Sequence, residues 1–337
     1  GSDSECVYFL NQGSVYFYAS NDDKYVINGK KLILGASEII LNNVLHKSTK
    51  RIETALSDHK SIIKKISVDK FLEGLNSFSF LLNVSMVLAK QVMLTNKIIN
   101  LNMSKLSSDE RLTKELATEY YTIIKRLKEE FHKRKFPWLK ELIKKYEINL
   151  TYKRGEAYFK TAEPVKLTNI VETSDHDNEY SRGDVICEEN TLGEEMYVLQ
   201  SGSLDVVINK NRVATINEPG TIIGEMALLL GEKRSATLIA KNNVVICKVN
   251  RAELKKLSES GSDILHNIVY SLAKRHYFNI IKIGSVNQSL IEQNLNEEEQ
   301  GKAQNHSIKA KSELNSLKSS IESIAKEKSA DFINDLL

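Results

Sequence analysis

Two stretches of the chain alternate apolar and polar residues over short runs, which is the pattern of half-buried β-strands. Each stretch is followed by residues with helical apolar periodicity, from roughly Val68 to Leu106 and from Leu254 to Ile283. NDDK and NGKK, between Ala19 and Lys31, predict turns of a longer hairpin in the first stretch. The sequence therefore predicts two small β structures, each followed by helices.

The two stretches also resemble each other in sequence. VYFLNQGSVYFY, from Val7 to Tyr18, matches MYVLQSGSLDVV, and RIETAL and SIIKKI match RSATLI and VVICKV in the same order. Arg51 then stands opposite Arg234, and we expect a six-residue change of spacing to fall near Ala19 to Lys31. We interpret the matches as a duplicated domain whose first copy lacks some strands at its front.

A helical spacer is predicted between the copies. An N-cap cluster at Ser107 precedes a periodic run that ends near Phe131, and Trp138 to Tyr146 predicts a shorter helix. Lys153 to Thr161 reads as a connector, and after Gly284 the chain becomes polar. The expected organisation is α+β, with two β-roll domains at 3–106 and 161–283, a helical spacer at 107–160 and a helical tail at 284–337.

The tail carries a heptad-like apolar stripe, formed by Leu314, Leu317, Ile321 and Ile324. The stripe spans fewer than three heptads. It predicts either an amphipathic helix that packs on its own chain or a helix that joins two copies of the chain in a homodimer.

Composition narrows the functional classes. The 337 residues exceed one ordinary core, and 47 basic against 44 acidic residues give a net charge of only +3, which favours no nucleic-acid partner. Polar residues interrupt the most apolar segment, Phe78 to Met93, so no membrane span is predicted. Three separated cysteines (Cys6, Cys187, Cys247) fit reduced thiols in the cytoplasm, and no secretion signal is visible.

The segment GTIIGEMALLLGEKRSAT, residues 220 to 237, has the chemistry of an anion site. Gly224 allows a tight backbone before a short helix with unpaired amides, and Arg234 returns a fixed cation to the same place. The planar fork of arginine suits phosphate oxygens, and Ser235 adds a hydroxyl donor. Glu225 would accept from a ribose hydroxyl; the alternative is an ordinary Glu225 to Arg234 surface ion pair worth about 0 to 1 kcal/mol.

This segment resembles the phosphate-binding cassette of the cyclic nucleotide-binding domain family, which includes catabolite-activator-type regulators and protein kinase regulatory subunits. The resemblance extends from about Lys166 to Ile283 and implies a β-roll flanked by helices. Ile223 replaces the usual Phe before Gly-Glu, and the loop from Glu189 to Gly193 also departs from the family pattern.

The resemblance assigns roles residue by residue. Glu225 would bind the ribose hydroxyl, Gly224 and Met226 would make backbone contacts, and Arg234 with Ser235 would bind the cyclic phosphate. Ala236 would contribute a backbone amide. The weaker assignments are the base-pocket residues Val206, Ala214 and Thr215, and a base-capping Arg275 or Asn279. Because Ser235 is small, the resemblance leans to cAMP rather than cGMP.

The first copy departs from this pattern. The alignment puts Leu41 and Asn42 where Gly224 and Glu225 stand, and Ile52 opposite Ser235, so that only Arg51 survives. It therefore predicts a degenerate domain that binds no nucleotide.

Other functional classes find little support. We see no nucleophile elbow, P-loop, kinase signature or spaced metal ligands, and Asp175-His176-Asp177 reads as a solvated turn, so neither an enzyme nor a cofactor is predicted. The polar tail has no basic recognition helix for DNA. The sequence predicts a cyclic nucleotide receptor whose protein partner it does not identify. The two alternatives are a cyclic dinucleotide sensor and a scaffold that binds no ligand.

Overall fold

The computed structural model describes residues 1–45, 50–159, 177–298, 306–328 and 330. The chain divides into two compact units, one of Gly1–Thr95 with Pro164–Tyr277 and the other of Asn96–Glu163 with Phe278–Leu337. Both β stretches therefore belong to the first unit, and the spacer and tail helices belong to the second.

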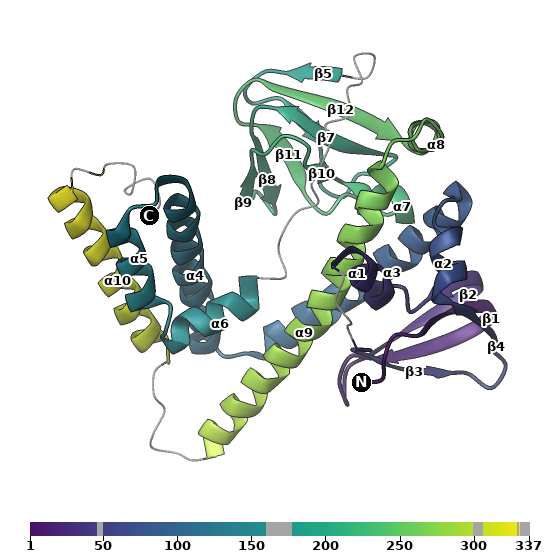
Figure 1. The fold of residues 1–337 in the computed structure, drawn as a ribbon, viewed down its shortest axis with the longest axis horizontal. Coiled ribbons are helices and arrows are strands. Elements are labelled where there is room, and N and C mark those ends of the chain that lie inside the picture. The colour runs from purple at the N-terminus through teal and green to yellow at the C-terminus, as the bar shows by residue number, and fades with distance from the viewer. Residues whose placement is uncertain (46–49, 160–176, 299–305, 329, 331–337) are drawn as a thin grey trace. The chain divides into compact units, whose positions relative to one another are not determined.

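The later β stretch folds into two four-stranded antiparallel sheets, ordered β10-β7-β12-β5 and β6-β11-β8-β9 (Figure 1). Side chains from both sheets, among them Tyr197, Leu199 and Leu238, form an apolar core. The strands are β5 (Asp177–Tyr180), β6 (Val185–Cys187), β7 (Glu195–Ser201), β8 (Leu204–Ile208), β9 (Asn211–Ile216), β10 (Ile222–Ile223), β11 (Thr237–Ala240) and β12 (Val244–Asn250).

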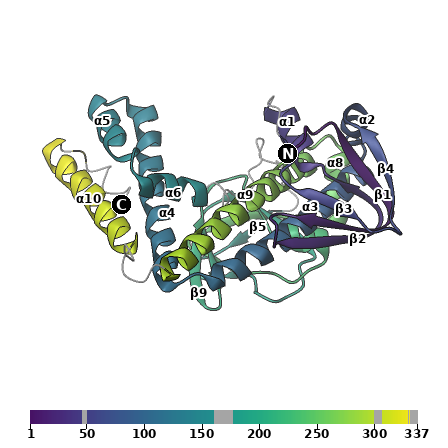
Figure 2. The ribbon, with the colours of Figure 1, turned by 90° about the horizontal axis from the view of Figure 1, so that it is seen from below.

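The first β stretch forms one four-stranded antiparallel sheet centred on β1 (Cys6–Tyr18) (Figure 2). β2 (Lys24–Leu34), β3 (Thr54–Ser57) and β4 (Ile62–Ser67) all pair with β1. Within the described part of the chain this stretch has no second sheet, so it does not show the two-sheet roll that we expected there.

One of the two predicted turns in this sheet is present. NDDK forms the turn between β1 and β2, where Ser20 Oγ donates to Asp23 Oδ2 over 2.8 Å. The turn predicted at NGKK is wrong, because Asn28 to Lys31 lie inside β2 and Gly29 stands opposite Gly13 of β1. Two glycines face each other there, so the strands approach without side chains between them.

The pairing registers of the two β stretches coincide. Ile33-Leu34, at the end of β2, pairs with Tyr8-Phe9, and β10 pairs in the same sense with Tyr197-Val198 of β7. A glycine with positive φ follows each of these strands, Gly35 (φ 74°) after β2 and Gly224 (φ 81°) after β10. The same kind of turn therefore follows the last paired residues of β2 and of β10.

The helices of the first unit share one core with its sheets. They include α1 (Ser37–Leu45), α2 (Val68–Gly74), the first part of α3 (Phe78–Lys105), α7 (Glu225–Leu230), α8 (Arg251–Glu259) and the first part of α9 (Ile264–Glu298). α3 has the length and apolarity of a membrane-spanning helix, but half of its most apolar window is buried in the structure. Core helices commonly meet the same criterion, since they too are rich in apolar residues.

The second unit is helical (Figures 1 and 2). α4 (Ser108–Arg134) begins where predicted, because the Glu110 amide donates to Ser107 Oγ over 3.2 Å. α5 (Pro137–Tyr146) has its proline at the first helical position, which needs no amide donor. α6 (Leu150–Phe159) occupies most of the expected connector, whose last residues lie outside the described ranges.

The apolar stripe of the tail packs on its own chain. Leu314, Leu317 and Ile321 of α10 (His306–Lys328) are buried in a core shared with α4 and α5. Lys318 and Glu119 form an ion pair of 2.6 Å between α10 and α4. Of the two interpretations of the stripe, this structure contains the intramolecular one.

The expected domain boundaries differ from those of the structure. We expected a break at Gly284, where the composition turns polar, but Gly284 lies within α9, which continues to Glu298. α3 likewise contains the division between Thr95 and Asn96, which we expected after Leu106. Composition missed both because each helix stays apolar on one face across the division.

Leu317→Ala should lower the free energy of unfolding by about 2 to 5 kcal/mol, since Leu317 is 0% exposed and truncation leaves a cavity. The matched control on the same helix is Ile308→Ala, which removes a side chain that is 62% exposed and should change stability by less than about 0.5 kcal/mol. Urea unfolding at two protein concentrations measures both. A loss for Leu317→Ala that appears only at the higher concentration would instead indicate a stripe between two chains.

Candidate functional site

The cassette predicted from the sequence forms a compact strand, helix and turn. β10 ends at Ile223, Gly224 takes a left-handed conformation, and α7 runs for six residues to Leu230. Gly231, also left-handed at φ 65°, ends the helix, and its amide donates to the Ala227 carbonyl over 2.8 Å. Both glycines stand where residues with a Cβ are strained, so the turn depends on them.

Arg234 is held beneath this turn. Its guanidinium carbon lies 4.7 Å from the centroid of the Tyr197 ring, and Nη2 donates to the Tyr197 hydroxyl over 3.0 Å. Nη1 donates to the Gly224 carbonyl at the long distance of 3.4 Å. Arg234 is only 6% exposed, and among the described residues no carboxylate lies within ion-pair distance of it. A buried cation without a counter-ion favours an anionic ligand.

Two glycines make room for that guanidinium. A Cβ on Gly224 would lie 2.3 Å from Arg234 Nη1, and a Cβ on Gly193 would lie 2.3 Å from the Cβ of Ala227 and 3.2 Å from Arg234 Cζ. Burial raises the pKa of the Tyr197 phenol even though Arg234 lowers it, so the phenol stays protonated beside the cation. The position of Arg234 therefore depends on close backbone approach and on Tyr197.

Glu225 is paired with a different residue from the one that the simple alternative predicted. Its carboxylate, 3% exposed, receives a hydrogen bond of 2.5 Å from Arg275 Nη1, which reaches it from α9. The alternative of a surface ion pair between Glu225 and Arg234 is wrong, because both side chains are buried and they do not pair. Glu225 is instead joined to the helix that follows the β domain.

The remaining cassette residues lie around the same turn. Ser235 is exposed and directly follows Arg234, Ala236 precedes β11, and Met226 packs partly buried against the core of the unit. The roles that the resemblance assigns to these residues stay predictions.

The candidates for the base pocket lie together on the hairpin of β8 and β9. Val206 of β8 pairs with Ala214 of β9, and Thr215 donates to Asp205 over 2.7 Å, with Ala214 and Thr215 both exposed. Arg275 belongs to the site through its bond to Glu225. The Asn279 amide, further along α9, donates to Asn96 over 2.9 Å, and its role as a capping residue stays a prediction.

The alignment of the first copy is wrong at its key positions. Leu41 and Asn42 lie inside α1, far along the helix from its start. Gly35 takes the place of Gly224, Arg51 Nη1 donates to its carbonyl over 2.7 Å, and Glu38 stands in the first turn of α1.

The cause of that error is the placement of the insertion. Gly35 and Arg51 are 16 residues apart, whereas Gly224 and Arg234 are 10 apart, so the extra residues lie between glycine and arginine and not near Ala19 to Lys31. The spacing from Gly13 to Gly35 equals that from Gly202 to Gly224, and this equality was the signal that could have found Gly35.

The sequence of the later β domain matches a known family. Residues 177–260 match the model of the cyclic nucleotide-binding domain family. The cassette and Arg234 lie inside that segment, whereas α9 and the first β stretch lie outside it.

One curated relative overlaps the same kind of segment. The Pycsar effector protein BcPycTIR of Burkholderia cepacia is 31% identical over 94 residues, which are 28% of this chain and 31% of that protein. The chain thus spans about a third of the length of this relative.

Two solved structures show distant likeness. The cAMP-bound structure of PfPKA-R (141-441) has a TM-score of 0.26 and 17% identity, with 87% of this chain and 76% of that chain covered. The N-terminal domain of a transcriptional regulator from Streptomyces coelicolor A3(2) has a TM-score of 0.26 and 22% identity, over 29% of this chain and 74% of that one. At these scores neither likeness carries weight for the fold.

The described part of the chain offers few candidates for a metal site or a reactive thiol. No group of three or more His, Cys, Asp or Glu residues there could hold a metal ion. Cys6, Cys187 and Cys247 form no disulfide in the described part of the chain; Cys247 is buried and the other two are half-buried. Burial raises the pKa of the Cys187 thiol, which disfavours the reactive thiolate.

Arg275→Gln should destabilise the protein by about 1 to 3 kcal/mol, because it leaves the buried Glu225 carboxylate without its cation. Urea unfolding of Arg275→Gln, of Glu225→Gln and of the double variant measures the coupling between the two side chains. The double variant should recover part of the loss. Strictly additive losses would show that the two side chains do not stabilise each other.

Proposed function

We propose that this protein is a cyclic nucleotide receptor, with cAMP as the preferred ligand, and that Arg234 binds the cyclic phosphate. The observation that carries the proposal is a buried guanidinium that has no carboxylate partner among the described residues, set in a segment that matches the cyclic nucleotide-binding domain. A phosphodiester would supply the missing negative charge through two parallel hydrogen bonds. Ser235, exposed beside Arg234, supports the preference for cAMP over cGMP.

Ligand binding at this site would also reach α9. A ribose hydroxyl that donates to Glu225 would share this carboxylate with Arg275, which lies on α9 and is bonded to its Oε1. The ligand would then favour a state in which Arg275, and with it α9, is released or repositioned. We propose this exchange as the step that passes occupancy of the site to a protein partner.

The wider proposal is a receptor without catalytic activity in which the two β stretches are diverged copies of one domain. Their shared strand registers and left-handed glycines, Gly35 and Gly224, support a common origin. A cytoplasmic location fits three cysteines that form no disulfide in the described part of the chain.

Calorimetric titration of the full chain with cAMP tests the site. Arg234→Ala should weaken cAMP binding about 100-fold, since two charge-assisted hydrogen bonds are lost, and Arg234→Lys should weaken it less because the charge remains. Arg182→Ala, which removes an exposed arginine from the same domain, is the matched control and should bind normally.

Thermal unfolding separates this proposal from its rivals. Saturation at about 100 times Kd should add roughly 2.7 kcal/mol of stability. A larger shift with a cyclic dinucleotide than with cAMP or cGMP would replace the ligand class. No shift with any of the three, together with unchanged behaviour of Arg234→Ala, would leave the scaffold as the better function.

A further inference from the structure

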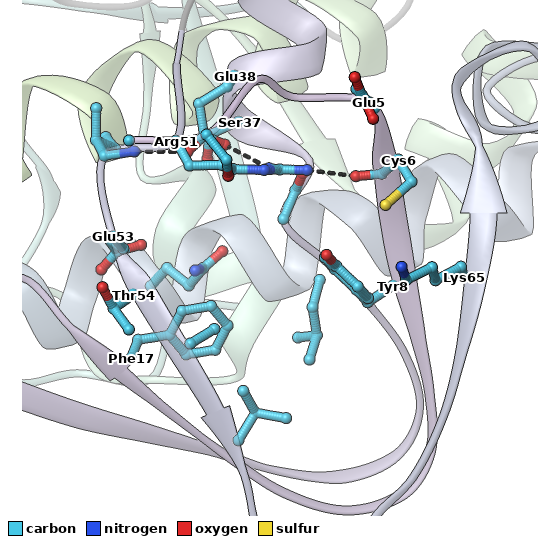
Figure 3. Close-up of a pocket in the computed structure, with 18 of the residues that line it drawn as sticks. Glu5, Cys6, Tyr8, Phe17, Ser37, Glu38, Arg51, Glu53, Thr54 and Lys65 are labelled. Carbon is cyan, nitrogen blue, oxygen red and sulfur yellow. Dashed lines mark hydrogen bonds and ion pairs between the residues drawn. The ribbon is translucent and has the colours of Figure 1, made fainter.

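A cavity in the first β stretch is lined in part by a residue of α9. Figure 3 shows Ser37, Glu53 and Arg51 around it, and its lining also includes His276 of α9. These residues all belong to the first unit. Because Arg51 corresponds to Arg234, His276 lies in the part of the first stretch that corresponds to the cassette site.

The imidazole of His276 is bonded through both of its nitrogens. Nδ1 lies 2.7 Å from Ser37 Oγ, and Nε2 lies 3.0 Å from the Tyr25 hydroxyl and 3.2 Å from Glu53 Oε2. A carboxylate can only accept, so these contacts fit a neutral ring with its proton on Nε2 and with Nδ1 accepting from Ser37. The first β stretch therefore binds a side chain of α9.

Tyr25 joins this group to a second helix. Its hydroxyl accepts from Gln91 Nε2 of α3 over 3.0 Å. Burial, followed by the charge of Glu53 and a hydrogen bond to it, holds the pKa of the Tyr25 phenol well above its ordinary value, so the phenol keeps its proton. His276, Tyr25 and Gln91 are all buried. A shift of the His276 ring would leave several buried polar groups without partners, which is unfavourable.

The residues that hold His276 are apolar in the later β domain. The strand registers agree, because Phe17 pairs with Tyr25 as Val206 pairs with Ala214. By register and by spacing from the shared glycine and arginine, Tyr25, Ser37 and Glu53 correspond in order to Ala214, Met226 and Ala236. The resemblance assigned those three positions to the ligand. The first stretch thus bonds His276 where the later domain would bind a nucleotide.

Arg275, the residue before His276, is bonded to the later domain. Its Nη1 donates to Glu225 of the cassette. Successive residues of a helix point about 100° apart, so one turn of α9 can bond both β stretches. Ile268 and Leu272 also pack α9 into the core of the unit, but apolar packing is not directional, whereas the bonds of His276 fix the rotation of the helix.

We propose that His276 occupies the site of the first β stretch in place of a ligand and is a positioning residue for the cassette. Its ring anchors α9 where Arg275 reaches Glu225. This role rests on the proposed function, since a ligand that displaces Arg275 must also strain the bonds of His276. The anchor lowers the affinity of the cassette for its ligand, and the first stretch regulates the later one.

Calorimetric titration of the full chain with cAMP tests the anchor through Ser37→Ala. This change removes the hydroxyl at Nδ1 and should tighten cAMP binding about two- to tenfold, the range expected for one hydrogen bond. Ser85→Ala is the matched control, because Ser85 is also buried in the first unit but its hydroxyl donates to Leu82 within α3. It should leave the affinity unchanged. Unchanged or weaker binding by Ser37→Ala overturns the proposal.

A double variant separates positioning from a loss of stability. In Arg275→Gln, α9 has lost its bond to Glu225, so the further change Ser37→Ala should leave the cAMP affinity as it is in Arg275→Gln alone. A general weakening of the fold would have the same effect in both backgrounds, and that result counts against the proposal.

Amide hydrogen exchange gives a measurement without ligand. The turn of α9 around His276 should exchange about two- to tenfold faster in Ser37→Ala than in Ser85→Ala. If the unchanged protein binds no cAMP, the receptor proposal fails, and this exchange alone decides whether His276 anchors α9. Equal exchange in the two variants overturns the anchor even if cAMP binds.

Discussion

The uncompensated charge of Arg234 is the constraint around which the later β domain is arranged. A buried guanidinium is costly, and here the cost is reduced by the face and hydroxyl of Tyr197 and by a backbone carbonyl, not by a carboxylate. That arrangement requires glycine at 193 and 224, since a side chain at either position would collide with the cassette. The two glycines are thus required by a buried cation that lacks a counter-ion among the described residues.

The same scaffold in the first β stretch carries the opposite solution. Strand register, left-handed glycine and arginine are all repeated, yet Glu38 neutralises Arg51 within the chain. An acidic residue in the first turn of α1 thus gives Arg51 a counter-ion within the chain.

These differences mark how far the sequence could be interpreted. GTIIGEMALLLGEKRSAT predicted the tight backbone at Gly224, the short helix and the return of Arg234 to its start, because each depends on local spacing. The left-handed conformation of Gly224 and the burial of Arg234 emerge only from the structure. The partner of Glu225 could not be predicted, since Arg275 is 50 residues away and reaches it only through the packing of α9. The equivalence of Gly35 and Gly224 was missed because the alignment placed the insertion in the hairpin of β1 and β2. The extra residues lie instead between Gly35 and Arg51, in the segment that contains α1.

The bond between Arg275 and Glu225 sets the energetic terms of any response to ligand. If the pair were exposed, a ribose hydroxyl could donate to Glu225 with little loss of free energy, and the ligand would not affect α9. Because Glu225 is almost fully buried, its carboxylate must always be satisfied, by Arg275 or by the ligand or by both. A group that binds one oxygen of Glu225 must therefore add to, or compete with, a cation that α9 already supplies to this carboxylate.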